Sequence, residues 1–184
     1  MPILRAMNAF GRSKPALRLV AGAGSPAAEW TWFCGHCAAP APKDEAPAPT
    51  ARVCRSCGLG LLLETRREIV PTDRDAFLVI DNTLLIQAMS RRAQTLLALS
   101  EEEAVNRPVA ELLVPADAEA QAAAGFAAAI AEAARGAEQP MSAVVRPWNT
   151  FGVRMRARIA ACGPPRAALV VLQGPRDRRL RAVD

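Results

Sequence analysis

The chain has 184 residues, of which 51% are hydrophobic, and a formal net charge of +5. This length allows one large or two modest domains, and the charge permits nucleic acid or an acidic protein as a partner without requiring either. The longest apolar runs fall far short of the roughly 20 residues of a transmembrane helix. We therefore expect a cytoplasmic protein that makes no membrane contact.

The first segment, residues 1–28, carries four cationic side chains and no acidic one. Its apolar part is too short for a secretory signal. The composition predicts a disordered basic tail.

Two Cys-x-x-Cys pairs follow, Cys34 with Cys37 and Cys54 with Cys57. Each pair can bind one ion from a single tight turn, and two such turns complete the tetrahedron of thiolates that Zn²⁺ accepts. We predict that these four cysteines hold a structural zinc ion. Since four thiolates close the coordination shell, we expect His36, inside the first pair, to be an exposed residue of its turn.

Two other uses of these cysteines compete with zinc binding. A disulfide framework suits small secreted domains, and this chain is longer and lacks a secretory signal. A thiol oxidoreductase built on Cys34 and Cys37 would need a helix directly after the pair, where the sequence has a proline-alanine segment instead.

The residues around the pairs predict a small module over residues 29–65. Residues 29–33 alternate polar and aromatic side chains, which indicates a short strand that places rings over the metal site. Leucines at 59 and 61–63 predict a second strand that covers one side of the module. Gly58 and Gly60 allow backbone N–H groups to point at the thiolates. The module resembles a zinc ribbon with rubredoxin-like knuckles.

A polar linker over residues 66–75 separates this module from a second domain, residues 76–174, and residues 175–184 form a charged tail. Ser90 and Ser100 are good N-caps for two short helices. Hydrophobic periodicity and turn residues predict strands at 76–80, 83–89, 141–145, 150–161 and 167–172, short helices after 90 and 100, and an alanine-rich helix over 115–135.

This order of elements resembles the PAS domain family. The resemblance includes the opening residues 76–81, the helix 91–97 and the segment 100–113, which matches the family's run of acidic residues before a short helix. It implies an α+β fold, in which a five-stranded antiparallel sheet has helices on one face, and a role in ligand sensing or protein interaction. The second domain contains no histidine for a haem and no cysteine at the position used by photoactive flavin domains, so we expect neither histidine-ligated haem nor covalent flavin.

An apolar pocket between the sheet and the helices would be lined by Leu97, Leu113, Phe126 and Met155, unless the core is fully packed. Cys162 is expected to be a small apolar filler.

The other face of the predicted sheet also carries apolar residues, because strands 76–80 and 167–172 are apolar on both sides. Such a patch is unusual on a monomer. We expect it to be covered by a second copy of the chain first, and otherwise by the zinc module or by a partner protein. Arg154, Arg156 and Arg158 would lie beside it, either solvated or as an anchor for acidic groups.

No nucleophile with an adjacent base, no carboxylate cluster and no phosphate-binding glycine loop is present. We therefore predict a non-enzymatic sensory or interaction protein in signal transduction or transcription regulation. Two alternatives remain open, a nucleic-acid-binding regulator that uses the zinc module and the basic tail, and the thiol oxidoreductase.

Overall fold

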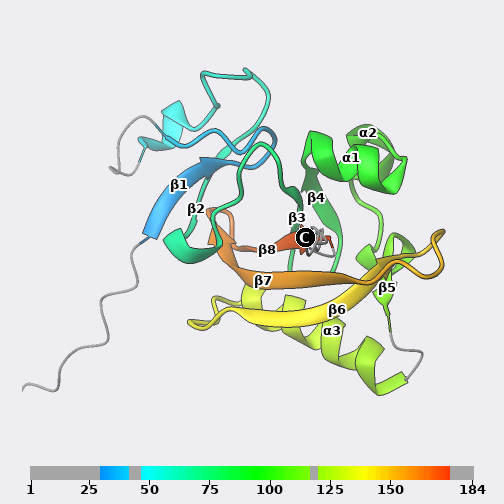
Figure 1. Ribbon diagram of the computed structural model, residues 1–184. Helices are drawn as coiled ribbons and strands as arrows, with labels where there is room; N and C mark the ends of the chain where they lie inside the picture. Colours follow the sequence, from blue (N-terminus) through cyan, green and yellow to red (C-terminus); the bar gives the residue numbers. More distant parts are fainter. Residues whose placement is uncertain (1–29, 42–46, 117–119, 175–184) are drawn as a thin grey trace, which may run out of the picture.

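The structure is a computed structural model that describes residues 30–41, 47–116 and 120–174. It has one curled antiparallel sheet, with helices packed on its inner face (Figure 1). The tails predicted at 1–28 and 175–184 lie outside the described residues. Within the described ranges, no helix is long and apolar enough to cross a membrane.

The elements are β1 (Trp30–Cys34), β2 (Leu62–Arg66), β3 (Ala76–Ile80), β4 (Ile86–Met89), α1 (Arg91–Leu97), α2 (Glu101–Ala104), β5 (Leu113–Pro115), α3 (Ala120–Ala134), β6 (Met141–Pro147), β7 (Met155–Gly163) and β8 (Ala167–Gln173). Three short 3₁₀ turns are η1 (Pro49–Ala51), η2 (Arg67–Ile69) and η3 (Val109–Glu111).

Five strands, in the order β4, β3, β8, β7 and β6, form the sheet that the sequence predicts. The sheet does not stop there. The end of β7 pairs with β2 through Thr65 opposite Cys162 and Glu64 opposite Gly163, and β2 pairs in turn with β1. The buried hydroxyl of Thr65 donates a hydrogen bond of 2.8 Å to the carbonyl oxygen of Ala161. The cysteine-bearing hairpin is thus an extension of the same sheet.

The inner face of the sheet packs against α1, α2 and α3. Fully buried side chains from all layers meet there, including Leu78, Ile130 and Ile159. The caps predicted for the short helices are confirmed. The Ser90 side chain accepts from a backbone N–H at the start of α1, and Ser100 forms a complete capping box on α2.

The apolar part of the outer face is covered by the cysteine-bearing hairpin and by η2. Phe33 of β1 lies edge to face against Phe77 of β3, with ring centroids 6.0 Å apart, and both side chains are fully buried. Leu63 and Ile69 join the same cluster. The linker predicted at 66–75 is therefore not a free hinge, because Ile69 anchors it to the sheet. Of the three covers expected for this face, the one seen in this chain is the module predicted at residues 29–65, which carries the four cysteines.

Several predicted elements have different limits in the structure, and two of the differences are large. The strand predicted over 150–161 begins only at Met155, and Phe151, expected on its apolar face, is 83% exposed in the connection before it. The segment predicted as a helix over 115–135 contains the end of β5 and then α3. Pairing of β5 with β6 is a long-range contact that helix propensity cannot reveal.

Candidate metal centre

The four cysteines meet between two turns. Cys34 ends β1 and Cys37 lies in the turn after it, while Cys54 and Cys57 lie in a second turn that leads toward β2. Their Sγ atoms all lie within 4.8 Å of one another. The Sγ atoms of Cys34 and Cys57 are 3.7 Å apart, and those of Cys37 and Cys54 are 3.9 Å apart. A tetrahedron with zinc–sulfur bonds of about 2.3 Å has edges of about 3.8 Å. The cluster therefore fits a tetrahedrally bound metal ion.

Backbone N–H groups point at the sulfurs from both turns. His36 and Cys37 donate to Sγ of Cys34 at 3.4 and 3.5 Å, and Gly60 donates to Sγ of Cys57 at 3.4 Å. These bonds stabilise thiolates and orient them. A Cβ atom on Gly60 would lie 2.4 Å from Sγ of Cys34. The lack of room for a side chain explains why residue 60 is a glycine. Its backbone N–H also donates to a cysteine sulfur, as the sequence predicted.

The thiols of Cys34, Cys37 and Cys57 have unequal pKa values. Burial raises the pKa of Cys34 and of Cys37, and this effect outweighs the backbone N–H bonds that lower it. Burial also acts on Cys57, but N–H bonds from Gly60 and Leu59 and the neighbouring thiols outweigh it and lower the pKa to about 6.

Apolar side chains shield one side of the cluster. Trp32 and Leu62 are buried against Cys34 and Cys54, so the aromatic ring predicted over the site is confirmed for Trp32. The predicted leucine cover is only partly correct, because Leu59 is 71% exposed.

His36 is buried, which corrects the expectation that it is exposed. Its ring nitrogen Nδ1 lies 2.8 Å from Oε2 of Glu101 in α2, a hydrogen bond in which the imidazole donates to the carboxylate. The other oxygen of Glu101 accepts the backbone N–H of Met89 at 2.9 Å. One carboxylate therefore links the first cysteine turn to α2 and β4. Sequence reasoning missed this contact because the two residues lie 65 positions apart and carry no local signal.

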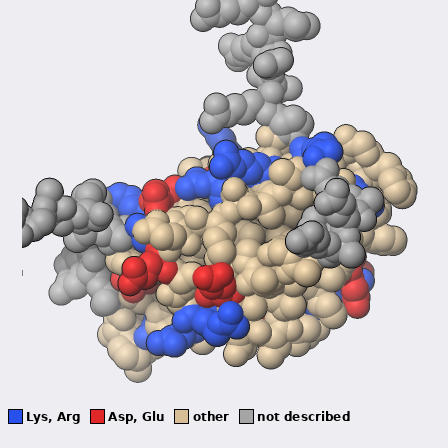
Figure 2. Space-filling view, turned by 90° about the horizontal axis from the view of Figure 1, so that it is seen from below, with Lys and Arg blue, Asp and Glu red and all other residues tan. Residues whose placement is uncertain are grey.

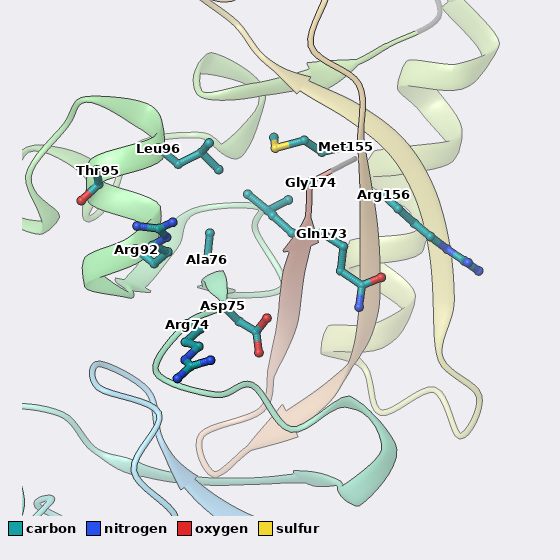
Figure 3. A pocket seen from close by; sticks show the side chains of 11 residues that line it. Arg74, Asp75, Ala76, Arg92, Thr95, Leu96, Met155, Arg156, Gln173 and Gly174 are labelled. Atoms are coloured by element: carbon teal, nitrogen blue, oxygen red, sulfur yellow. The ribbon is translucent and has the colours of Figure 1, made fainter. Parts of the chain in front are cut away.

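A cavity of about 950 Å³ opens between α1 and the ends of β3 and β8 (Figure 3). Leu96 and Met155 line its apolar side, and Arg74 and Arg92 lie at its rim. Of the lining residues predicted from the sequence, Met155 borders this cavity. The other three, Leu97, Leu113 and Phe126, are packed in the inner-face cluster.

Comparison with known protein families identifies the domain that follows the cysteine turns. Residues 64–147 match the family model described as the PAS fold. The chain contains a PAS domain. The match begins within β2 and ends with β6, and β7 and β8 complete the PAS sheet in the structure.

Solved structures of PAS domains are similar to the chain at low sequence identity. The PAS domain of nitrogen regulation protein NR(II) from Vibrio parahaemolyticus is 15% identical with a TM-score of 0.41, over 55% of this chain and 89% of that one. A PAS domain from Colwellia psychrerythraea is 19% identical with a TM-score of 0.43, over 56% and 88%. The E. coli DhaR(N)-DhaL complex matches at 17% identity and a TM-score of 0.37, over 55% of this chain and 32% of that one. No curated protein matches the chain.

The PAS sheet also explains the place of Cys162. Its side chain is buried in the outer-face cluster, where burial raises the pKa of the thiol to about 12. A thiol in this environment stays protonated and packs as an apolar group, as expected of a filler.

Proposed function

We propose that this chain is a non-enzymatic sensory and interaction protein in which a structural zinc ribbon is fixed to the outer face of a PAS domain. The observation that carries the proposal is that one hairpin does two things. Its turns bring four cysteines close enough to hold one metal ion, and its Phe33 and Leu63 cover the apolar part of the outer face of the PAS sheet. A PAS domain indicates a sensory or signal-transduction role, and the ribbon then serves as a built-in cover rather than a separate module.

Zinc is the metal that the donor set favours. Tetrahedral sites made of four thiolates are typical of zinc or of iron bound by sulfur. The site is closed by four protein ligands, with no position left for substrate, so the ion's role is structural. It stabilises a hairpin whose own apolar core is small.

The PAS part supports sensing. The cavity beside α1 offers space for a small ligand, with apolar side chains on one side and arginines at the rim. The output is a protein partner, in signal transduction or transcription control, because no catalytic constellation accompanies either region. A homodimer remains a prediction. The argument for it from an exposed apolar face no longer applies, because the ribbon covers the apolar half of that face.

Metal content and local stability test the proposal. The full chain, purified under reducing conditions, is expected to hold about one zinc ion and to be colourless. Cys54→Ser should remove the metal and increase amide hydrogen exchange in β1, β2 and the end of β7, while α3 stays protected. Cys162→Ser is the matched control and should keep the metal.

Two results would overturn the proposal. One is a metal-free chain that is fully folded with the cysteines of each pair oxidised to each other. The other is loss of metal with unchanged exchange on the outer face, which would show that the ribbon does not act as its cover.

A further inference from the structure

The positive charge of the chain is concentrated in its last three strands. Residues 139–174 contain five arginines and no acidic residue, and the rest of the chain carries equal numbers of cationic and anionic side chains. The net charge of +5 therefore belongs to β6, β7, β8 and their connections. On the α3 side, by contrast, basic and acidic groups are scattered over a surface that is mostly uncharged (Figure 2).

Strand alternation places Arg156 and Arg158 of β7 on the outer face. Arg158 lies opposite Val171 of β8, and Val171 is part of the cluster under the ribbon. Arg156, two residues earlier, is exposed and shares that side of β7. Arg156 also borders the cavity beside α1, and its side chain extends away from the middle of that cavity (Figure 3). The outer face is therefore divided into an apolar half under the ribbon and an arginine-bearing half that is open.

A hydrogen bond marks the boundary between the apolar half and the arginine-bearing half. Arg158 donates a hydrogen bond to the carbonyl oxygen of Glu68 in η2, at the edge of the ribbon cover. Beyond this residue the face is hollowed, with a depression of about 410 Å³ lined by Ser142, Val144, Arg154, Arg156, Gln173 and Gly174.

Two exposed aromatic side chains lie in the connection between β6 and β7, a few residues before Arg154 of the hollow. Trp148 is 56% exposed and Phe151 is 83% exposed. The guanidinium carbon of Arg146 lies 5.0 Å from the centroid of the Phe151 ring, and a guanidinium nitrogen of Arg146 donates to the carbonyl oxygen of Trp148 at 3.2 Å. The side chains of Arg146 and Phe151 are thus held together at the protein surface, and neither belongs to a buried cluster.

We propose that this surface, formed by Val144, Arg146, Trp148, Phe151, Arg154 and Arg156 and here named the arginine face, binds single-stranded nucleic acid. Arginines spaced about 6.7 Å apart along a strand can follow a phosphate backbone, and exposed rings provide stacking platforms for bases. The face is a sheet surface with no helix to enter a major groove, so it suits an unpaired strand rather than a duplex. An acidic peptide would form ion pairs with the arginines but would not stack on the two aromatic rings.

The test uses the full zinc-loaded chain and fluorescence anisotropy with labelled oligothymidylate and oligouridylate of about 20 nucleotides. Trp148→Ala and Phe151→Ala should each weaken binding between about 5-fold and 150-fold, as expected for loss of stacking on one base. Neither substitution should change the salt dependence. Arg156→Gln should weaken binding and reduce the slope of log K against log salt by about 0.7.

Matched controls separate this surface from general charge. Arg135→Gln removes the same charge from an exposed position after α3 and should leave binding nearly unchanged. Replacing Arg5, Arg12 and Arg18 together by glutamine tests the basic N-terminal segment. Circular dichroism and zinc content confirm that each variant is folded.

Three outcomes would overturn the proposal. The first is no binding at low salt. The second is loss of binding on substitution of the N-terminal arginines while Arg156→Gln has no effect. The third is equal competition by polyglutamate together with full binding by the Trp148 and Phe151 variants, which would assign the arginine face to an acidic protein.

Discussion

The ribbon and the PAS domain differ sharply in how they are held together. The inner-face cluster of the PAS domain draws buried side chains from its sheet and from all three helices. In the described part of the ribbon, the cluster around the cysteines has only four buried members, and two of these, Cys34 and Cys54, are predicted metal ligands. So small a core cannot fold on apolar burial alone. From this difference we expect the ribbon to depend on a bound metal ion at one end and on the PAS sheet at the other.

Phe33→Ala tests the dependence on the sheet, and we expect the largest effect from it. The ring is fully buried against Phe77, so its loss should lower the free energy of unfolding by about 3–5 kcal/mol. Denaturant unfolding measures this change. Leu59→Ala, at a side chain that is 71% exposed, is the control and should change stability by less than about 0.5 kcal/mol. Equal effects of the two substitutions would mean that the ribbon and the sheet do not share a core.

Gly60→Ala tests the dependence on the metal. The added Cβ would collide with Sγ of Cys34 and would disturb the N–H donor to Cys57. We expect zinc affinity to fall about 10- to 100-fold, measured by competition with a chelator. Gly125→Ala, in α3 with open space around the new Cβ, should leave zinc affinity unchanged. An unaltered affinity in Gly60→Ala would contradict the cysteine geometry described above.

Glu101→Gln sharpens the comparison at the contact between the two regions. The amide can still accept from Met89, but it replaces the carboxylate that pairs with His36. Because Glu101 is partly exposed, we expect a loss of about 1 kcal/mol with full zinc content retained. Glu102→Gln removes the same charge from an exposed neighbour and should have little effect. Zinc loss in Glu101→Gln would instead place this carboxylate in the metal site.

Asp81→Asn gives the smallest effect and concerns the PAS domain alone. Burial raises the pKa of Asp81, but hydrogen bonds from Thr83, Leu85 and Gln87 outweigh it and lower the pKa below its ordinary value of 3.8. The carboxylate therefore stabilises the fold above the unfolded-state pKa, and this contribution is lost as pH falls through the folded-state pKa.

We expect the variant to be less stable than the parent chain by up to about 1 kcal/mol at neutral pH. The difference should shrink as the pH falls below about 4. Thermal unfolding of both proteins across this range measures it. A stability difference that increases as the pH falls would show that the hydrogen bonds favour the protonated form of Asp81.

Much of the candidate site was predictable because its signals are local. Two cysteines separated by two residues specify one metal-binding turn wherever the chain folds, and Ser100 with Glu103 specifies a helix start from four residues. The same locality explains the errors. Phe151 fits the alternation of the strand that follows it, yet it lies in the connection before β7 and is exposed.

The sequence by itself determined the two cysteine turns, the capped short helices and five strands of the PAS domain, because each depends on residues within about one element of each other. Tertiary structure alone decided that β2 pairs with β7, that His36 meets Glu101, and that the ribbon covers one half of the outer face. These contacts join residues far apart in the chain, and the free energy that selects them comes from burial shared between the two regions, which no local pattern records.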